Sequence, residues 1–410
     1  MYRACWRIGA IAAPIHHGAG RDETAALVAR LAPRAQVAWS DVPLRALAGT
    51  IDYDDVDISS GSVVERWTDP AALAAVLFTS GSSGAPKGVL HTQRSLGYKA
   101  RLMAEVHGLG PGDAVLMPAP LAHISGLLNG VTLPGVAPFK SVLMARWDPE
   151  HALALIEQER VTYMIGPPTF FVSLMAAPGF SSERVASLRL VSSGGAGVTE
   201  AFVEEAESRL GCLVKRTYGS TEAPSIATSR RDDDPQAARR HDGRALGSVQ
   251  LRVSESGELC VQGPELFSGY LDRDDTAAAV DDGWFRTGDL ATLDDGWLRI
   301  VGRIKDLIIR GGENIAAAEV EAVLERHPAV SQAVAVGYPD RLMGERVCAF
   351  VVATGAFDLD ACRAWFAEQG VTPFKTPERI EIVDVLPLLA TGKPDRVALR
   401  AVAAQLVEPR

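Results

Sequence analysis

The feature that most constrains the fold is an alternation of short apolar runs with amphipathic stretches between about residues 70 and 225. Runs such as "AVLMPAPL" and "VTYMIG" are typical of buried strands. Between them, "DPEHALALIEQER" and "TEAFVEEAESRLG" have helical spacing, and Thr199 stands where it can cap the second helix. Strands that alternate with helices favour parallel sheets covered by helices, so we expect an α/β fold.

Two later changes of pattern divide the chain. Closely spaced strands and turns over 246–301 predict a β-rich subdomain, either an antiparallel sheet or a small barrel. Strand and helix patterns then alternate in a compact α+β unit up to the last residue. We therefore expect a large domain over residues 1–304 and a small C-terminal α+β domain over residues 305–410.

Composition excludes several classes of protein. The net charge of −10, without a long basic block, does not favour a nucleic acid or an anionic membrane surface as partner. No apolar run approaches the roughly 18 residues that a membrane-spanning helix needs, and "IGAIAAPI" (8–15) reads as a strand. The five cysteines are scattered and lack C-x-x-C spacing, which fits a reducing, cytoplasmic compartment.

A glycine-rich stretch, "TSGSSGAPKG" (79–88), follows an apolar run that reads as a strand. Backbone amides of such a turn can point at a phosphate without obstruction by side chains. A mobile surface loop is the alternative interpretation. The stretch is not a Walker A motif, because Lys87 is followed by glycine and not by serine or threonine, which disfavours a P-loop kinase or NTPase.

Four further stretches follow this loop in order: "YGSTEA" (218–223), "WFRTGDL" (284–290), "GRIKDLIIRGGENI" (302–315) and "ATGKPDR" (390–396). Together the five stretches resemble the adenylate-forming, or AMP-binding, superfamily. The resemblance is greatest to acyl-CoA synthetases of the fatty-acid–CoA ligase type, and it covers nearly the whole chain.

The resemblance implies an acid–thiol ligase that uses ATP, Mg²⁺ and coenzyme A. A carboxylic acid is first converted to acyl-AMP with release of pyrophosphate, and the acyl group then passes to coenzyme A. The segment "PLAHISGLLNG" (120–130) resembles the start of an acyl pocket and lacks the aspartate of amino-acid-activating relatives. We therefore expect an apolar acid, either medium-chain, alicyclic or fatty; a carrier protein as acceptor and a homodimer stay open.

The resemblance also assigns roles to individual residues. It implies catalytic roles for Lys393, Thr221, Glu222 and His123, with Glu222 also holding the magnesium ion. Without it, a Thr-Glu pair is more often a helix cap, and a lysine after glycine in a loop is more often a solvated charge. The residues implied to bind ATP or AMP are Thr79, Ser80, Gly81, Ser82, Ser83, Gly84, Lys87, Gly194, Gly195, Ala196, Tyr218, Gly219, Thr221, Asp289 and Arg303.

Three residues have roles implied in domain movement. Lys305 matches the hinge about which the small domain rotates between the two half-reactions, and Gly311 and Gly312 match the lining of a tunnel for coenzyme A. The small domain is therefore expected to be mobile.

The chain departs from the family pattern at its beginning. Family members usually carry a substantial segment before the point that matches "WRIGAIAAPI" (6–15), so an N-terminally shortened large domain is expected. This departure keeps two alternatives open. One is a non-catalytic remnant that binds nucleotide or acyl ligand, and the other is an acyl-AMP ligase that loads a carrier protein.

Overall fold

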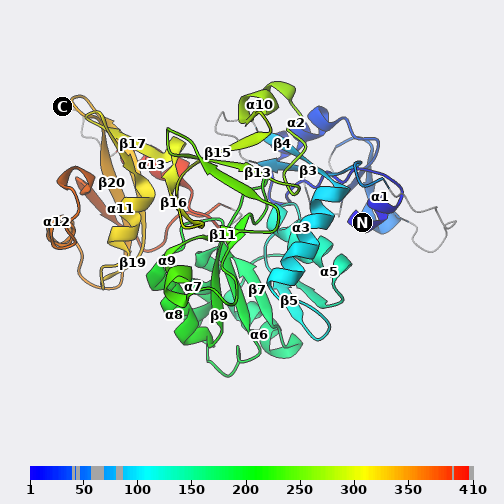
Figure 1. The fold of residues 1–410 in the computed structure, drawn as a ribbon, viewed down its shortest axis with the longest axis horizontal. Helices are drawn as coiled ribbons and strands as arrows, with labels where there is room; N and C mark the ends of the chain where they lie inside the picture. The colour runs from blue at the N-terminus through cyan, green and yellow to red at the C-terminus, as the bar shows by residue number, and fades with distance from the viewer. Residues whose placement is uncertain (39–41, 43–46, 57–68, 80–85, 390–391, 406–410) are drawn as a thin grey trace.

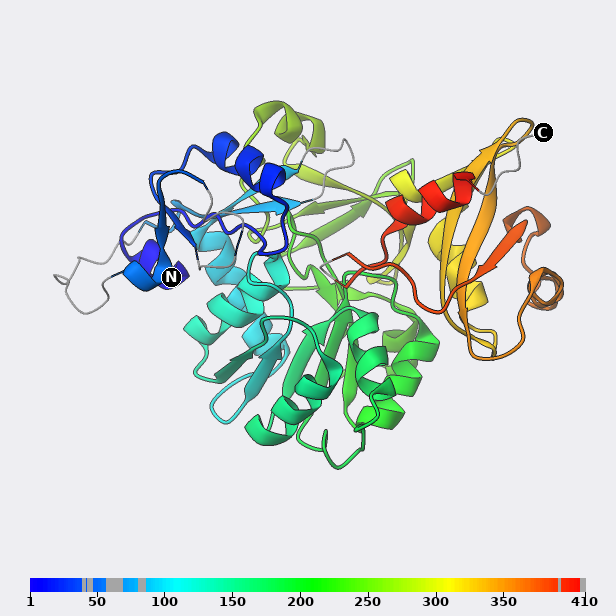
Figure 2. The same cartoon turned by 180° about the vertical axis from the view of Figure 1, so that it is seen from behind.

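The computed structural model describes residues 1–38, 42, 47–56, 69–79, 86–389 and 392–405 (Figures 1 and 2). One long sheet crosses the centre of the molecule, and a smaller sheet lies at the C-terminal end. The order of the long sheet is β12-β13-β15-β16-β11-β10-β9-β8-β7-β5-β6.

The half of the long sheet from β9 to β6 is parallel. Its strands are β5 (Ala114–Met117), β6 (Lys140–Leu143), β7 (Tyr163–Gly166), β8 (Leu190–Gly194) and β9 (Leu213–Tyr218). Its covering helices are α3 (Gln93–Val106), α6 (Pro149–Glu159), α7 (Pro168–Ala176) and α8 (Glu200–Leu210). Parallel strands with helices between them confirm the expected α/β class.

Both faces of this parallel half are buried, as the alternation of side chains along β5 shows. Leu116 belongs to the core under α6, α7 and α8, whereas Val115 and Met117 belong to the core under α3. Successive strand residues point to opposite faces, so a strand covered on both sides reads as a continuous apolar run. Helix α8 begins as predicted, because the Thr199 hydroxyl accepts a hydrogen bond from the Phe202 amide at 3.2 Å.

The other half of the long sheet is antiparallel and continues from β9 without a break. Its strands are β10 (Ala227–Thr228), β11 (Gly243–Ala245), β12 (Gln250–Val253), β13 (Glu258–Gln262), β15 (Trp284–Asp294) and β16 (Trp297–Arg303), with β14 (Val280–Asp281) paired to β15. Helix α10 (Arg273–Ala279) precedes β14. The strand and turn pattern over 246–301 therefore corresponds to an extension of the central sheet.

A separate five-stranded sheet follows the short 3₁₀ helix η4 (Ile304–Asp306). Its strands are β17 (Leu307–Arg310), β18 (Glu313–Ala316), β19 (Val330–Asp340), β20 (Gly344–Ala353) and β21 (Arg379–Ile382). Its helices are α11 (Ala317–Leu324), α12 (Leu359–Glu368) and α13 (Arg396–Gln405). Along β19, Ala333 and Ala335 pack with α11 and α12, whereas Val334 and Val336 pack with α13, so helices cover both faces.

The N-terminal part packs beside the carboxyl edge of the parallel strands. It contains α1 (Tyr2–Arg7), α2 (Arg21–Leu31), β1 (Gln36–Ala38), β2 (Thr50–Asp52), and the hairpin β3 (Leu73–Thr79) and β4 (Lys87–Thr92). The strand expected at 8–15 is wrong as a strand, because only a one-residue bridge joins Ala12 to Ala75. Within the described ranges, every helix is too short or too polar to cross a membrane.

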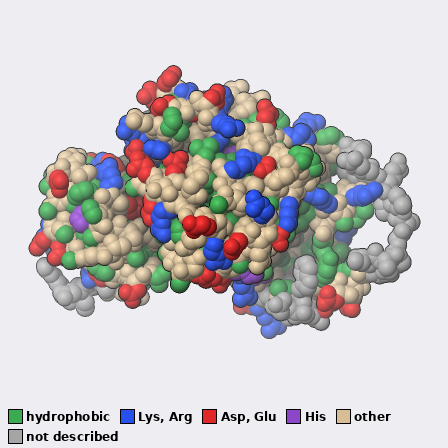
Figure 3. All heavy atoms as spheres, turned by 90° about the horizontal axis from the view of Figure 1, so that it is seen from below, with side chains coloured by type: hydrophobic (Ala, Val, Ile, Leu, Met, Phe, Trp, Pro, Cys, Tyr) green, Lys and Arg blue, Asp and Glu red, His purple; other side chains and the backbone are tan. Residues whose placement is uncertain are grey.

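Charged side chains of both signs are interspersed on the face shown in Figure 3. Elsewhere in the chain, charges of opposite sign are paired, as Arg239 is with Glu207 at 2.7 Å and Arg184 with Glu157 at 3.0 Å. Paired charges of mixed sign present little net field to a polyanion.

Candidate active site

The candidate site begins at the carboxyl ends of β8 and β9, where parallel α/β sheets usually bind ligands. A Cβ at Gly194 would collide with the carbonyl oxygen of Thr217 on β9, so the two strands approach this closely only with glycine. Gly195 follows with a φ of +79°, and Ala196 completes the bend. The structure thus places Gly194, Gly195 and Ala196 in a turn at the ligand-binding edge, with Gly195 exposed and the other two partly buried.

The residues after β9 form a compact loop. A Cβ at Gly219 would collide with the Ser225 amide, and Thr221 is buried. The imidazole of His91, on β4, lies with Nε2 2.8 Å from the Thr221 carbonyl oxygen. Burial lowers the pKa of His91 to about 4, so the neutral ring donates to this carbonyl.

Asp289 lies on β15 directly opposite Arg303 on β16 and is only 2% exposed. One carboxylate oxygen accepts from Arg303 Nε at 2.6 Å, and the other accepts from the Tyr218 hydroxyl at 2.5 Å. Burial, together with the negative charge of Asp289, raises the pKa of Tyr218 well above its ordinary value. Three residues predicted from separate motifs therefore form one hydrogen-bonded group.

Lys393 reaches this group from the small sheet's domain. Its loop is held on α7, where the Thr169 hydroxyl donates to the Gly392 carbonyl oxygen at 2.8 Å. A Cβ at Gly195 would lie 3.3 Å from Lys393 Cε, so the lysine stem passes over the bend after β8. Burial and the nearby Arg303 lower the pKa of Lys393 to about 8, against the opposing influence of Asp289 and Glu222.

Glu222 follows Thr221 in the loop after β9. Its Oε1 accepts a hydrogen bond from the Tyr270 hydroxyl at 2.8 Å, and its backbone carbonyl accepts from the Phe267 amide at 2.8 Å. Burial and the charge of Glu222 raise the pKa of Tyr270, so the phenol keeps its proton and acts as the donor. The carboxylate is thereby oriented by an aromatic side chain 48 positions further along the chain.

Lys87 opens β4 and pairs with Thr79 across the β3–β4 hairpin. Its ammonium lies 2.8 Å from an Asp275 carboxylate oxygen and 5.1 Å from the centre of the Tyr270 ring. The hairpin therefore brings both described ends of the glycine-rich stretch close to the Glu222 loop. The remaining predicted residues of that stretch, Ser80, Gly81, Ser82, Ser83 and Gly84, lie outside the described residues.

His123 caps the short helix α4 (Ile124–Gly126), and its Nδ1 accepts from the Ser125 amide at 3.3 Å. Burial, together with the nearby Lys393 and His16, lowers the pKa of the imidazole to about 4. A neutral histidine close to Lys393 is placed at the site, at the start of the segment expected to form the acyl pocket.

Of the other predicted small-domain residues, Lys305 also acts on the group, because its charge helps to lower the pKa of Lys393. Lys305 is in η4, and its carbonyl oxygen accepts from Arg400 at 3.3 Å. Gly311 and Gly312 have φ of +58° and +90° in the turn between β17 and β18, where the Gly311 amide donates to the Met343 carbonyl at 2.7 Å. The structure thus brings Lys393, and not these glycines, to the large domain.

The residues present fit magnesium that arrives with a nucleotide. Within the described ranges there is no group of three or more His, Cys, Asp or Glu side chains able to hold an ion. Glu222 offers one carboxylate whose orientation Tyr270 sets. Mg²⁺ is commonly held by one or two carboxylates together with substrate phosphates, and a single oriented glutamate suits that mode.

Tyr270, Asp275, His91 and Thr169 are site residues that sequence reasoning missed. Tyr270 comes to Glu222 because the segment 269–271 pairs with β4, through hydrogen bonds such as Leu271 N to Gly88 O at 2.7 Å. This pairing joins positions about 180 residues apart, and no local spacing reveals it.

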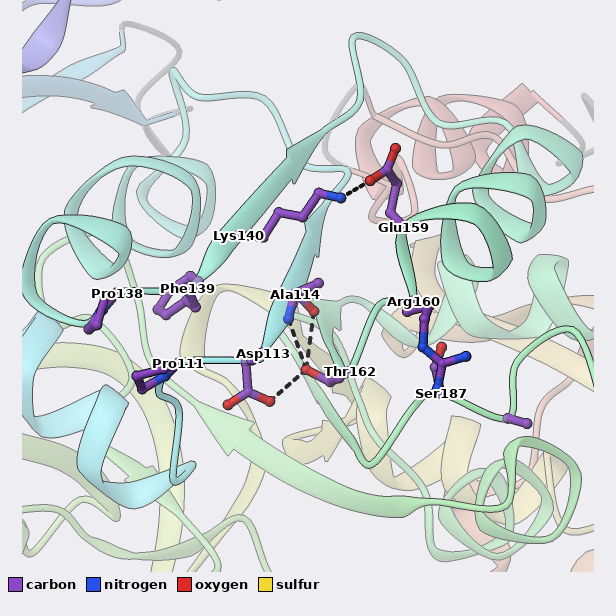
Figure 4. Close-up of a pocket in the computed structure, with 12 residues that line it drawn as sticks. Pro111, Asp113, Ala114, Pro138, Phe139, Lys140, Glu159, Arg160, Thr162 and Ser187 are labelled. Atoms are coloured by element: carbon purple, nitrogen blue, oxygen red, sulfur yellow. Dashed lines mark hydrogen bonds and ion pairs between the residues drawn. The ribbon is translucent and has the colours of Figure 1, made fainter.

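A second hollow lies at the opposite, amino edge of the parallel strands (Figure 4). It contains none of the predicted site residues, and its polar groups contact one another, as the Thr162 hydroxyl does with Asp113 at 2.6 Å. The lining residues are Pro111, Gly112, Asp113, Ala114, Pro138, Phe139, Lys140, Glu159, Arg160, Thr162, Ala186 and Ser187.

Comparison with known proteins matches two parts of the chain. Residues 1–271 match the family described as AMP-binding enzyme, and residues 319–393 match the AMP-binding enzyme C-terminal domain.

Two relatives are 37% identical to the chain. Over 344 residues it is similar to the medium-chain fatty-acid–CoA ligase of Escherichia coli, covering 80% of this chain and 61% of that protein. Over 371 residues it is similar to the 3-[(3aS,4S,7aS)-7a-methyl-1,5-dioxo-octahydro-1H-inden-4-yl]propanoyl:CoA ligase of Mycobacterium tuberculosis, covering 88% of this chain and 73% of that protein. The chain thus spans less than two thirds of the length of the Escherichia coli relative.

Among solved structures, the chain is similar to ATP-bound MatB from Rhodopseudomonas palustris. The TM-score is 0.90 at 26% identity, covering 99% of this chain and 86% of that one. The apo form of the same protein gives a TM-score of 0.77 at the same coverage.

Proposed function

Because the chain belongs to the AMP-binding enzyme family, we propose that it activates a carboxylic acid with ATP and passes the acyl group to coenzyme A. In the first step a carboxylate oxygen attacks the α-phosphorus, so acyl-AMP forms and pyrophosphate leaves. In the second, the thiol sulfur attacks the acyl carbon, its proton is lost, and AMP leaves. The observation that carries the proposal is the approach of Lys393 to the carboxyl edge of the large sheet.

Lys393 stabilises the first transition state by its charge. With a pKa of about 8, its ammonium is protonated roughly ten to one at pH 7. A cation held in place where negative charge develops lowers the barrier without having to reorganise during the reaction. The bond from Thr169 to Gly392 holds the loop of this cation, and the absence of a side chain at Gly195 leaves room for the lysine stem.

The large domain supplies the nucleotide contacts. Asp289 offers two carboxylate oxygens to the ribose hydroxyls, Tyr218 lies beside the adenine, and Arg303 orients Asp289 through the bond from its Nε. Thr221 contacts the α-phosphate, and the stretch from Thr79 to Lys87 holds the β- and γ-phosphates. Magnesium, held by Glu222 and the phosphates, would neutralise phosphate charge.

The small domain, residues 305–410, turns about Lys305 relative to residues 1–304, which include the β-rich part over 246–301. One orientation presents Lys393 for adenylation, and the other presents Gly311 and Gly312 beside the thiol of coenzyme A. The higher TM-score to ATP-bound MatB than to its apo form supports the first orientation for the structure described.

The acid is apolar in this proposal. The names of the two relatives specify a medium-chain fatty acid and an alicyclic propanoyl group, which supports an apolar side chain. The π-helix Leu127–Thr132 follows His123, and π-helical turns are frequent at functional sites. His123 lies at the carboxylate end of the acyl pocket in this assignment.

The test is product analysis across a panel of acids. Purified protein with ATP, Mg²⁺, coenzyme A and a medium-chain or alicyclic acid is expected to give AMP, pyrophosphate and acyl-CoA. ADP in place of AMP would exclude adenylation. Acyl-AMP without acyl-CoA would favour a carrier protein as acceptor, and nucleotide binding without turnover would favour a non-catalytic role.

A further inference from the structure

The ion pair between Lys87 and Asp275 lies at the end of the stretch proposed to bind phosphate. We propose that Asp275 is a positioning residue that competes with pyrophosphate and with the phosphates of ATP for the Lys87 ammonium. The inference rests on the proposed function, in which Lys87 binds those phosphates. As a consequence, Asp275 lowers the affinity of the site for pyrophosphate and favours release of this product from Lys87.

Both partners are fixed by backbone structure. Lys87 is held by its pairing with Thr79 in the β3–β4 hairpin. The chain just before α10 is held to the same hairpin by Leu271 N to Gly88 O at 2.7 Å and Leu90 N to Gly269 O at 3.0 Å. Asp275 lies in the first turn of α10, so the hairpin sets the separation of the carboxylate and the ammonium.

The pair is exposed enough for a ligand to displace it. The Lys87 and Asp275 side chains are 24% and 28% exposed and meet at 2.8 Å. By contrast, the Lys99–Glu265 pair is 0% exposed on both sides, and Lys99 also donates to the Ser225 carbonyl at 2.7 Å. Breaking a buried pair of that kind leaves an uncompensated buried charge, whereas a partly exposed pair can exchange partners at little cost.

Tyr270 places the ion pair next to the phosphate side of the site. The Lys87 ammonium lies 5.1 Å from the centre of the ring, and the hydroxyl of the same ring donates to Glu222 at 2.8 Å. Lys87 therefore has Asp275 as an anion within reach, and a phosphate bound beside Glu222 would be a second. A polyanion that carries several charges outcompetes one carboxylate for the Lys87 ammonium. The net free energy of binding is smaller, however, because the ion pair with Asp275 must first be broken.

The experiment is calorimetric titration of the full chain with inorganic pyrophosphate in the presence of Mg²⁺, which needs no turnover. Asp275→Asn is expected to bind pyrophosphate about two- to fivefold more tightly than the wild-type protein, the size expected for a partly exposed pair. Asp274→Asn is the matched control, since it removes the same charge from the neighbouring, exposed position of α10. Thermal unfolding verifies that each variant folds.

The outcomes separate the inference from the proposed function. Tighter binding by Asp275→Asn than by Asp274→Asn, with a gap that shrinks in high salt, supports the competition. Equal affinities for the two asparagine variants, with Lys87→Ala binding more weakly than wild type, overturn the role of Asp275 alone. If Lys87→Ala binds as tightly as wild type, Lys87 does not hold phosphate, and both the inference and that part of the proposed function are wrong.

Discussion

The two edges of the parallel sheet both carry charged and hydroxyl side chains, but they use them differently. At the amino edge, Asp113 accepts from Arg189 at 2.8 Å, from Thr162 at 2.6 Å and from the Gly110 amide at 2.9 Å. Lys140 pairs with Glu159 on the rim of the same hollow (Figure 4). The Asp113 carboxylate and the Lys140 ammonium at this edge are therefore each paired within the fold.

At the carboxyl edge the main cation has no such partner. Among the described residues, no carboxylate lies within ion-pair distance of Lys393, whose pKa burial lowers to about 8. Burying an unpaired ammonium costs stability, and perturbed groups of this kind are concentrated at functional sites. The comparison teaches that polar side chains alone do not mark the site; the carboxyl edge differs in holding a partly buried ammonium with no carboxylate at ion-pair distance among the described residues.

The largest effect is expected from removing that cation. Lys393→Ala should slow adenylation on the order of 10²- to 10³-fold, the loss typical of removing one preorganised charge or donor. Thioester formation from synthetic acyl-adenylate should stay within about twofold, because the proposed second orientation does not use this lysine. Pyrophosphate release and acyl-CoA formation, measured separately, give the two rates.

Lys375→Ala is the matched control for this lysine. Lys375 lies in the same domain but pairs with Glu319 of that domain at 2.6 Å. The Lys375→Ala variant should leave the rates of both half-reactions unchanged. Equal losses in both half-reactions for Lys393→Ala would contradict the assignment of the lysine to adenylation alone.

The next effect concerns the carboxylate group at the same edge. Asp289→Asn should raise the KM for ATP about 10- to 100-fold, because hydrogen bonds to a charged acceptor are each worth about 1.5–3 kcal/mol. The change also leaves the Arg303 guanidinium without its counter-charge. Initial rates against ATP concentration measure the KM; an unchanged value would show that Asp289 only orders β15 and β16.

The pH dependence follows from Lys393. Because the pKa of Lys393 is lowered to about 8, its ammonium loses its proton as pH rises through that value. The rate of adenylation should fall with it. kcat/KM for ATP should therefore fall about tenfold per pH unit above that point. In Lys393→Ala this descending limb should disappear, and a limb that persists would identify another titrating group.

The smallest effect is expected from substitutions at the amino edge, which should change the free energy of unfolding but not the reaction. Asp113→Asn should lower the free energy of unfolding by about 1–2 kcal/mol without changing the KM for ATP. Partial burial raises the pKa of Asp113, but hydrogen bonds from Arg189 and Thr162 lower it by more, so the pKa is lowered overall. Its contribution is therefore present near neutral pH and lost as pH falls below about 4.

Denaturant unfolding at pH 7 and pH 3 measures this contribution. Lys140→Ala, which breaks the more exposed pair with Glu159, should change stability by less than about 1 kcal/mol. A rise in the KM for ATP in either variant would mean that the amino edge also serves the reaction.

Much of the fold could be predicted locally. The apolar runs of β5, β7 and β8 and the Thr199 cap of α8 follow from short-range patterns, whereas Asp289, Tyr218 and Arg303 were assigned through the family resemblance. The strand expected at 8–15 could not be judged in that way. Only Ala12 bridges to Ala75, and Ile8 and Ile11 are exposed, which a run of hydrophobic letters does not distinguish from a full strand.

What the sequence by itself determined was the chemistry available: glycines at tight turns, a lysine in a loop, and carboxylates in motif order. Only the tertiary structure decided which of these groups meet. Thr169 holds Gly392 across 223 positions, Tyr270 orients Glu222, and Asp275 pairs with Lys87. Periodicity and caps are set within a few residues, whereas such contacts depend on how whole sheets and domains pack against each other.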